Sequence, residues 1–314
     1  ELEQVIKLLR QSERPLIIAG GGVHYSLASD ELAQFAQTHN IPVAETQAGK
    51  GCLNWQHPYA VGGIGVTGSQ AANTLAQQAD VIVAIGSRLQ DFTTESRTLF
   101  NKSDVKLIQI NVGQFDASKH GAVPLLADAK SALQALTSAL NGWKSVPQWT
   151  EQIVSADQDW QATYEQVTAD NGTSLPSDAQ VLGAIKRKSA DKDVIVCAAG
   201  GLPGDLHKLW RCEDEKSYHV EYGFSCMGYE IAGGLGVKMA SPDRDVFVVV
   251  GDGSYMMMNS ELATSVMMGQ KIIVVVLDNR GFGCINRLQQ ATGNEPFNNL
   301  LADCHTVDSG APKL

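Results

Sequence analysis

The chain contains few of the features that mark several common protein classes. Its six cysteines form no CxxC pair and show no zinc-finger spacing with histidine, which argues against a zinc site and against a dense disulfide framework. Lysine and arginine number 24 against 34 aspartates and glutamates, and no basic run occurs, so nucleic acid is not expected as a partner. Buried free thiols in a reducing cytoplasm are expected for Cys52, Cys197, Cys212, Cys226, Cys284 and Cys304.

Long apolar runs are also missing. The longest ones, "DVFVVVG" and "KIIVVVLD", have the length of strands and fall far short of the roughly 20 residues that a membrane-spanning helix needs. We therefore expect no membrane contact. The chain of 314 residues is long enough for about two domains, and because it starts at Glu1 without a methionine or a signal-like segment, we expect it to be a fragment.

Strand-like and helix-like segments alternate in two regions. Strands are expected at "PLIIAGGG", "DVIVAIGS" and "VKLIQINV" in a first region, 1–142, and at "DVIVCAAGG", "DVFVVVG" and "KIIVVVLD" in a second region, 174–314. Between them, residues 143–173 are polar, with Trp149 and Trp160 embedded, and this predicts a linker that packs on another part of the chain. The alternation predicts an α/β fold with two doubly wound parallel-sheet domains.

A glycine-rich stretch in the first region has the outline of a dinucleotide fingerprint. In "GGIGVTG", the residues Gly63, Gly65 and Gly68 follow the order GxGxxG. The fingerprint also needs a strand directly before it and an acidic residue at the end of the next strand. The preceding "NWQHPYAV" contains a proline and no clear strand, and the next strand ends in "AIGSR". A loop that leads into a helix is therefore expected here.

A carboxylate stands at the mouth of an apolar strand in the second region. "DVFVVV" leads into Gly251-Asp252-Gly253, a helix is expected from about 259 to 268, and "KIIVVVL" then carries the chain to Asp278 and Asn279. One βαβ unit would set both strands parallel and place both polar ends at the same edge of the sheet, where open α/β sheets bind ligands. Carboxylate, amide and carbonyl oxygens suit Mg²⁺ with phosphate and water.

A GDG triplet followed after 25 intervening residues by Asn279, with a helix and a strand in between, resembles the signature of thiamine diphosphate enzymes. The resemblance implies that Asp252, Asn279 and the main-chain carbonyl of Gly281 hold the Mg²⁺ that anchors the diphosphate. Asp278 stands where the family commonly has a first asparagine that does not bind the metal.

Further stretches resemble family segments around the cofactor. "AAGGLPGDL" resembles a loop against the diphosphate, and "EYGFSCMGYEIAGG" resembles the segment beneath the thiazolium ring, where the carbonyl of Ser225 would accept from the aminopyrimidine and Met227 would bend the cofactor. The residues expected at the cofactor are Gly200, Gly201, Leu202, Ser225, Met227, Gly251, Gly253 and Ser254.

The resemblance also implies domains and an activity. Residues 1–142 would form the middle, Rossmann-like domain, and 174–314 the diphosphate-binding domain, truncated at its C-terminal end. Within the family, "DNRGFGCINRLQQATG" is most similar to members that open a cyclic 1,2-diketone by C–C bond hydrolysis in myo-inositol catabolism. The implied partners are thiamine diphosphate, Mg²⁺ and a small cyclic polyol dione, in a cytoplasmic homo-oligomer, a dimer or tetramer at full length.

Several points stay open at the level of sequence. In the family, the glutamate that activates the pyrimidine ring lies on a domain that precedes the first region, so no catalytic residue is assigned and the chain alone is expected to be inactive. His219 is the histidine best placed to face a substrate. An acetolactate-synthase-like 2-oxoacid carboligase remains an alternative, as do a dinucleotide-dependent oxidoreductase and a non-catalytic scaffold protein.

Overall fold

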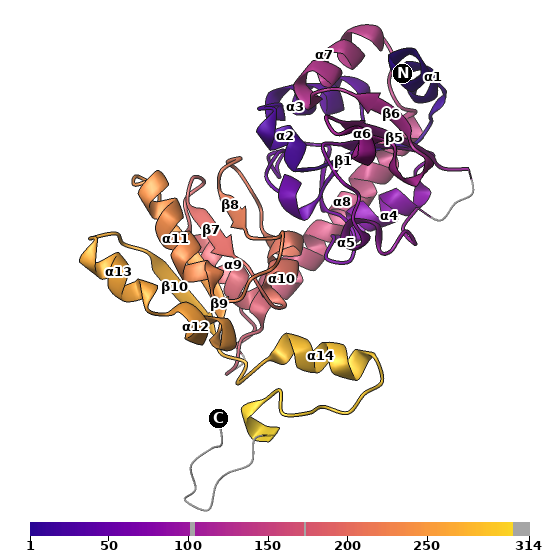
Figure 1. Cartoon of the computed structure of the whole chain (residues 1–314). Helices are drawn as coiled ribbons and strands as arrows, with labels where there is room; N and C mark the ends of the chain where they lie inside the picture. Colours follow the sequence, from indigo (N-terminus) through magenta and orange to yellow (C-terminus); the bar gives the residue numbers. More distant parts are fainter. Residues whose placement is uncertain (101–103, 173, 304–314) are drawn as a thin grey trace, which may run out of the picture. The chain divides into compact units, whose positions relative to one another are not determined.

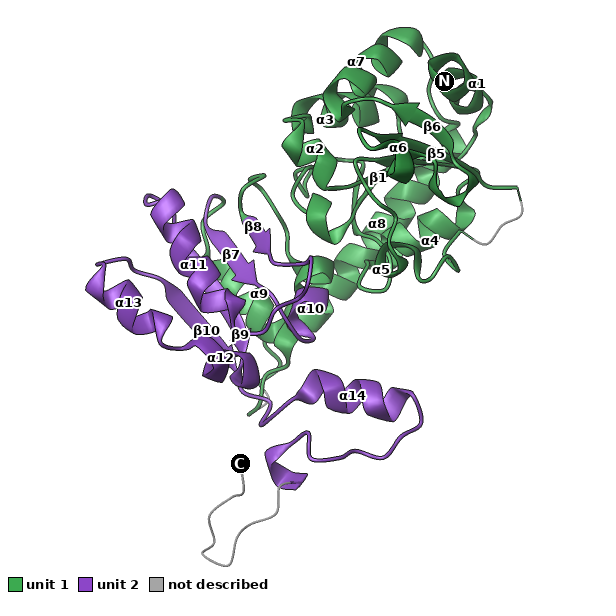
Figure 2. Ribbon diagram, in the orientation of Figure 1, with its two compact units in different colours: residues 1–191, 206–217 green, residues 192–205, 218–314 purple. Residues whose placement is uncertain are grey.

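The computed structural model describes residues 1–100, 104–172 and 174–303, so that Cys304 lies outside the described residues. The chain forms two compact units (Figure 2). Unit 1 consists of Glu1–Asp191 with Leu206–Ser217, and unit 2 consists of Lys192–Asp205 with the chain from Tyr218 onward. Each unit is an α/β structure around one parallel sheet, which confirms the expected fold class.

Unit 1 contains a six-stranded sheet in the order β3-β2-β1-β4-β5-β6, in which every neighbouring pair is parallel (Figure 1). All five residues of β1 and all five of β4 are buried, because helices cover both faces of a parallel sheet and leave no wet side. The strands are β1 Pro15–Ala19, β2 Val43–Glu45, β3 Ala60–Gly63, β4 Val81–Ile85, β5 Lys106–Asn111 and β6 Val123–Leu126.

The helices of unit 1 begin at recognisable capping residues. Ser69 accepts a hydrogen bond from the amide of Ala72 before α4, and Asp128 accepts one from Ser131 before α7. The α-helices are α1 Leu2–Gln11, α2 Gly21–Tyr25, α3 Ser29–His39, α4 Gln70–Gln78, α5 Asp91–Thr94, α6 Gln114–Ala117, α7 Ala129–Ala139, α8 Pro147–Thr168 and α9 Asp178–Lys188, and the 3₁₀ turns are η1 Gln47–Gly49 and η2 Lys119–Gly121.

In the segment expected to be a linker, residues 147–168 form the 22-residue helix α8, which belongs to unit 1. Pro147 occupies the first turn, where its missing N–H costs nothing. Trp149 is buried and donates from Nε1 to the carbonyl of Pro15 at 2.9 Å, and α8 packs against α4 and α9. Trp149 therefore packs on another part of the chain as expected, while the division into family domains at this segment stays a prediction.

Unit 2 contains a four-stranded parallel sheet in the order β10-β9-β7-β8. Its strands are β7 Val194–Cys197, β8 Tyr218–Val220, β9 Val246–Gly251 and β10 Ile273–Leu277. Its helices are α11 Tyr229–Ala240, α12 Asp252–Met258, α13 Glu261–Met267 and α14 Gly283–Ala291, with the 3₁₀ turn η3 Leu301–Asp303; α10 Leu202–Leu209 begins in unit 2 and ends in unit 1.

The helical segment after β9 starts earlier than the sequence predicts. Instead of one helix over 259–268, α12 begins at Asp252 directly after the strand, and α13 follows after a break at Asn259 and Ser260. Gly253 suggests a loop by its low helix propensity. In the structure it lies inside the helix, and the space of its missing side chain is taken by the ring of Phe282, whose Cε1 would lie 2.9 Å from a Cβ at position 253.

The cysteines differ in part from the expectation. Cys52, Cys197 and Cys212 are buried free thiols, and burial raises the pKa of Cys212 to about 12. Cys226, however, is exposed, because it lies in the open loop between β8 and α11, and Cys284 is half-buried. Among the described residues no helix combines the length and the apolarity needed to cross a bilayer.

Candidate functional site

The carboxyl edge of the sheet in unit 2 gathers the residues that the sequence singles out. β9 pairs with β10 on one side, with Gly251 opposite Leu277, and with β7 on the other. The chain therefore leaves β7, β9 and β10 at one edge of the sheet, and after β9 it enters α12 directly. The chain crosses from β7 to β8 on one side and from β9 to β10 on the other, so this edge contains a topological switch point, the usual ligand crevice of such sheets.

Asp252 has one carboxylate oxygen without a partner. Its Oδ2 accepts a hydrogen bond from the amide of Gly281 at 2.8 Å, which brings the GDG turn and the loop after β10 together. Its Oδ1 is buried and accepts no hydrogen bond from the described residues. A buried carboxylate oxygen without a partner is costly, and a bound cation removes that cost.

Asn279 lies in the same loop, two residues before Gly281. Gly283 leaves room for its carboxamide, since a Cβ at position 283 would lie 3.0 Å from the Cγ of Asn279. A carboxylate, a carboxamide and main-chain carbonyls form a set of hard oxygen donors that fits Mg²⁺. Within the described part of the chain, no group of three or more His, Cys, Asp or Glu side chains could hold a metal. The residues present therefore fit a magnesium ion that takes its remaining ligands from phosphate and water.

Two neighbouring glycines in the loop after β7 differ in their surroundings: Gly200 has free space beside it, and Gly201 lies against Arg287. Gly200 has a φ of +89°, and a Cβ there would meet nothing within 4 Å. At Gly201, a Cβ would collide with the guanidinium of Arg287, from α14. Leu202 is buried and begins α10. Gly200 is thus the position of this loop where a ligand can approach the backbone closely.

The loop between β8 and α11 is held by the carboxylate of its first residue, Glu221. Glu221 accepts hydrogen bonds from the amides of Phe224 at 3.0 Å and Cys226 at 2.7 Å. Burial raises the pKa of Glu221, but these hydrogen bonds outweigh it and hold the pKa below its ordinary value. Ser225 has a φ of 53° and donates from Oγ to the carbonyl of Ala198 at 3.1 Å. Met227 approaches Gly253, with its Cε 3.7 Å from the position of a Cβ there.

Glu230 is the residue at this edge that sequence reasoning missed. It is fully buried in the first turn of α11 and accepts hydrogen bonds from the amides of Ala199 and Gly228, both at 3.1 Å, and from the hydroxyl of Ser254 at 2.8 Å. The sequence did contain a signal, because "GYEIAGG" places one acidic residue at the start of an otherwise apolar, glycine-rich helix.

His219 lies on β8 and faces Tyr229. Its Nε2 lies 2.7 Å from the hydroxyl of Tyr229, and the two rings are stacked with their centres 5.9 Å apart. Burial lowers the pKa of His219, which favours the neutral imidazole at neutral pH. His219 therefore has an internal partner, and its role toward a substrate stays a prediction.

The glycine-rich stretch of unit 1 does follow a strand, which corrects the sequence prediction. β3 is only four residues long and lies at the edge of the sheet, so its apolar pattern is too short to recognise. A Cβ at Gly63 would lie 2.7 Å from the imidazole of His207, and one at Gly68 would lie 2.8 Å from Oδ1 of Asn73. Side chains of the protein therefore fill the space beside Gly63 and Gly68.

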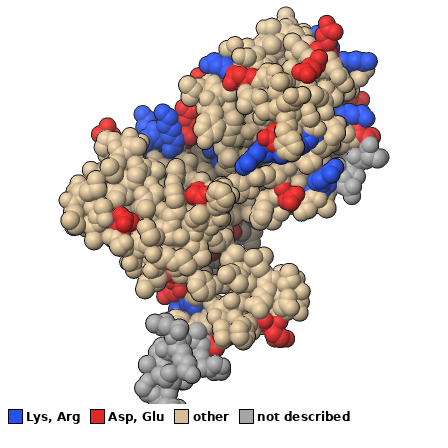
Figure 3. Space-filling view, viewed as in Figure 1, with Lys and Arg blue, Asp and Glu red and all other residues tan. Residues whose placement is uncertain are grey.

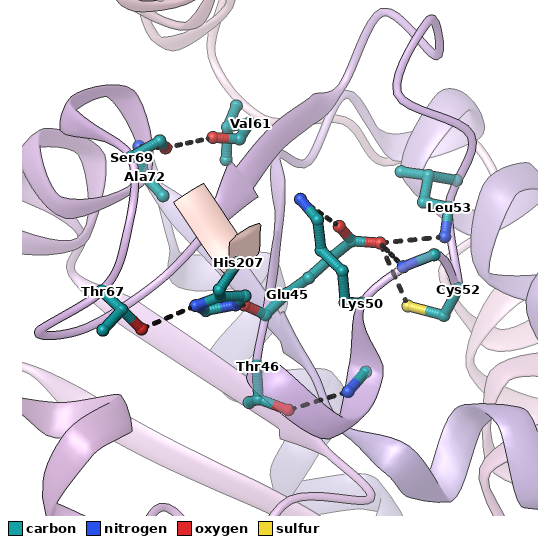
Figure 4. A network of polar contacts seen from close by, with 12 residues as sticks. Glu45, Thr46, Lys50, Cys52, Leu53, Val61, Thr67, Ser69, Ala72 and His207 are labelled. Atoms are coloured by element: carbon teal, nitrogen blue, oxygen red, sulfur yellow. Dashed lines mark hydrogen bonds and ion pairs between the residues drawn. The ribbon is translucent and has the colours of Figure 1, made fainter. Parts of the chain in front are cut away.

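His207 belongs to a buried polar network in unit 1 (Figure 4). Its Nε2 lies 2.9 Å from the carbonyl of Glu45 and its Nδ1 lies 2.9 Å from the hydroxyl of Thr67. Because a carbonyl only accepts, Nε2 carries the proton and Nδ1 accepts from Thr67. Glu45 itself accepts from the amides of Gly51 and Leu53 and lies 3.5 Å from the ammonium of Lys50. Burial lowers the pKa of His207 to about 3.

This network makes unit 1 sensitive to acid. The ordinary pKa of histidine, 6.5, applies to His207 in the unfolded chain, while the folded value is about 3. Between these values only the unfolded chain binds the proton, so the free energy of unfolding falls by about 1.4 kcal/mol for each pH unit below 6.5. From pH 7 to pH 5, His207 should lower the free energy of unfolding of unit 1 by about 2 kcal/mol.

The variant His207→Gln tests this effect, because its carboxamide offers a donor and an acceptor for both hydrogen bonds but does not titrate. We expect it to lose this part of the pH dependence in denaturant titrations. If the free energy of unfolding falls equally with pH in both proteins, the expectation is contradicted.

Comparison with known proteins identifies both parts of the chain. Residues 2–136 match the family description "Thiamine pyrophosphate enzyme, central domain", and residues 198–308 match "Thiamine pyrophosphate enzyme, C-terminal TPP binding domain". A protein of Geobacillus thermodenitrificans named 3D-(3,5/4)-trihydroxycyclohexane-1,2-dione hydrolase is 45% identical over 94% of this chain and 49% of its own length. A protein of the same name from Bacillus cereus is 42% identical over 94% of the chain and 50% of its own length.

The matches extend over most of the chain and over both compact units. The chain spans about half the length of the curated relatives it matches. The segment 198–308 contains the GDG turn, the loop with Asn279 and Gly281, and Glu230, and the segment 2–136 contains the six-stranded sheet. The chain belongs to the thiamine pyrophosphate enzymes, with their central domain followed by their C-terminal TPP binding domain.

Proposed function

We propose that the whole protein containing this chain hydrolyses 3D-(3,5/4)-trihydroxycyclohexane-1,2-dione to 5-deoxyglucuronate, a C–C bond cleavage of myo-inositol catabolism that depends on thiamine diphosphate. The observation that carries the proposal is the identity of 42 to 45% over 94% of the chain to relatives that are named for this reaction. The unpartnered carboxylate oxygen of Asp252 supports the metal-dependent part of it.

In this proposal, Asp252 and Asn279 bind Mg²⁺ through their side-chain oxygens and Gly281 binds it through its carbonyl. The hydrogen bond from the amide of Gly281 to Oδ2 of Asp252 supports the arrangement, because it fixes the carboxylate and leaves Oδ1 for the ion. The residues around the diphosphate are Gly200, Gly201, Leu202, Gly251, Gly253 and Ser254. Gly251 is well suited to this role, since a Cβ at its position would meet nothing within 4 Å.

Thiamine diphosphate, when bound, supplies the carbanion stabilisation that C–C bond cleavage needs, and the protein supplies binding and orientation. We propose that the carbonyl of Ser225 accepts a hydrogen bond from the aminopyrimidine and that Met227 is the bulky residue that forces the cofactor into a bent shape. The left-handed backbone of Ser225 and its hydrogen bond to Ala198 support a fixed orientation of that carbonyl. His219 stays our candidate to face the substrate, as a neutral group held by Tyr229.

We further propose that residues 1–142 and 174–314 correspond to the middle and diphosphate-binding domains, joined by 143–173, and that the whole protein is a cytoplasmic homo-oligomer, a dimer or tetramer. Exposed apolar side chains on unit 2 support an assembly, because exposed patches of this kind mark interaction surfaces. They gather on α12, on α13 and on the residue that follows α13, and comprise Met256, Met257, Met258, Val266, Met267 and Met268. Figure 3 shows few charged side chains over the face of unit 2 in view.

The test is the stoichiometry of turnover by the whole protein with thiamine diphosphate and Mg²⁺. We expect each molecule of the cyclic dione to be opened with uptake of one water, without release of carbon dioxide, and mass spectrometry of the product in ¹⁸O-labelled water measures this. Pyruvate is the control substrate, because an acetolactate-synthase-like carboligase releases carbon dioxide from it. Turnover of pyruvate with carbon dioxide release, and none of the dione, would replace the proposal by the carboligase.

A further inference from the structure

We infer that Glu230 is a positioning residue that fastens together three segments of the proposed cofactor site, and this inference rests on the proposed function. Its carboxylate is the common acceptor for a donor from each segment: the amide of Ala199 in the loop after β7, the amide of Gly228 in the loop before α11, and the hydroxyl of Ser254 in the first turn of α12. The three segments are far apart in sequence, and Glu230 joins them through one side chain.

The geometry assigns a separate task to each carboxylate oxygen. Oε1 accepts from Ala199 at 3.1 Å, while Oε2 accepts from both Gly228 at 3.1 Å and Ser254 at 2.8 Å. The amide of Gly228 also donates to the Ser254 hydroxyl at 2.7 Å, and this hydroxyl in turn donates to Oε2, so the groups around Oε2 are hydrogen-bonded to one another. A glutamine cannot replace this arrangement, because its NH₂ group is a donor and would face either an amide N–H or two further donors.

Burial makes this junction rigid. Glu230 has no exposed surface, and Ser254 is 4% exposed. A hydrogen bond to a charged acceptor is stronger than one between neutral groups, and a buried donor that loses its acceptor bears its full desolvation cost. Moving one of the three segments away would therefore break a buried hydrogen bond. Glu230 holds the segments in one arrangement before any ligand arrives.

These three segments carry the proposed cofactor contacts. Gly200 to Leu202 follow Ala199, Ser225 and Met227 precede Gly228, and Gly251, Gly253 and Ser254 flank Asp252. Glu230 itself has no exposed surface in α11, so we expect it to act on the cofactor only through these segments. Preorganised segments lower the cost of ordering the site on binding, and residues that orient ligands in this way commonly contribute tenfold to hundredfold in affinity.

The experiment compares Glu230→Gln with the wild type in the whole protein by calorimetric titration with thiamine diphosphate in saturating Mg²⁺. We expect an affinity about tenfold to a hundredfold lower in the variant. The matched control is Glu45→Gln, which also alters a buried glutamate that accepts backbone amides, but in unit 1. It should lower stability without a comparable loss of affinity.

Amide hydrogen exchange of the cofactor-free proteins provides a second measurement. Glu230→Gln should speed exchange at Ala199 and Gly228 and leave Gly51 and Leu53 unchanged, while Glu45→Gln should do the reverse. If Glu230→Gln does not fold, Glu230→Asp, which keeps the charge but is one methylene too short to reach all three donors, is measured in its place.

The outcomes separate the two proposals. A wild-type protein that does not bind thiamine diphosphate would overturn the proposed function, and the inference with it. A wild type that binds, together with a folded Glu230 variant of equal affinity, would overturn the inference and leave the function standing. A loss of affinity as large in Glu45→Gln as in Glu230→Gln would also overturn it, because general destabilisation would then explain both.

Discussion

Asp252→Ala should abolish the binding of thiamine diphosphate with Mg²⁺ while the protein stays folded. The variant removes the only acidic ligand of the proposed ion and with it the acceptor of the Gly281 amide. Because Mg²⁺ relies on one or two protein carboxylates, the loss of this one should weaken cofactor binding by more than a hundredfold, which corresponds to about 3 kcal/mol or more. Calorimetric titration of the whole protein measures the affinity.

Asp278→Ala is the matched control for this experiment. Asp278 follows the neighbouring strand, is exposed, and uses its Oδ1 to accept from the amide of Arg280 at 2.9 Å. It also carries a carboxylate and lies next to Asn279, but this carboxylate accepts from the amide of Arg280, whereas that of Asp252 accepts from the amide of Gly281. We expect near wild-type affinity. Thermal unfolding of both variants checks that they fold, and a folded Asp252→Ala protein that retains the cofactor would remove Asp252 from the metal site.

The sequence was sufficient to predict the parts of the fold that depend on local pattern. The apolar runs of β9 and β10, with a helical segment between them, predicted a parallel pair, and the register of Gly251 with Leu277 confirms it. Once that pair is known, Asp252 and Asn279 have to leave the sheet at one edge, whatever the rest of the chain does. The same reasoning located β1, β4 and β5 of unit 1, since buried strands of parallel sheets are continuously apolar.

What the sequence could not predict depends on contacts between distant residues. β3 was missed because four residues at a sheet edge, two of them glycine, carry almost no periodic signal. The hydrogen bonds of Glu230 were missed because its partners Ala199 and Ser254 lie 31 residues before and 24 residues after it. The early start of α12 was missed because the sequence shows only the low helix propensity of Gly253. The ring of Phe282, which packs against Gly253, becomes visible only in the structure.

The helix α8 belongs to the same group of features, and its polarity explains why the sequence predicted a linker. Of its 22 residues, only Trp149, Ile153, Tyr164 and Thr168 are buried. The many polar residues on its exposed side therefore make the narrow apolar stripe difficult to recognise in the sequence. The two buried residues near its start, Trp149 and Ile153, are four apart and lie on the same face of the helix. A helix that is anchored by so few side chains should depend strongly on the largest of them.

Trp149→Ala should therefore lower the free energy of unfolding of unit 1 by about 3 to 5 kcal/mol, the usual cost of removing a buried tryptophan. The side chain is 1% exposed, and its Nε1 donates to the carbonyl of Pro15, the first residue of the central strand β1. The variant thus creates a cavity beneath α8 and removes the hydrogen bond partner of a buried carbonyl. Denaturant titration that follows the unfolding of unit 1 measures the change.

Two further variants decide how that loss arises. Trp149→Phe keeps most of the packing but leaves the Pro15 carbonyl without its donor. It should lower the free energy of unfolding by about 1 to 3 kcal/mol. Trp160→Ala changes a half-buried tryptophan of the same helix that packs at the margin of the core, and should cost less than Trp149→Ala because less apolar surface returns to water. If the two alanine variants cost the same, Trp149 does not anchor α8 and the segment 143–173 is a loosely attached connection. If Trp149→Ala costs far more, the segment is part of the folded core of unit 1, because only a side chain enclosed by that core leaves a cavity when it is removed.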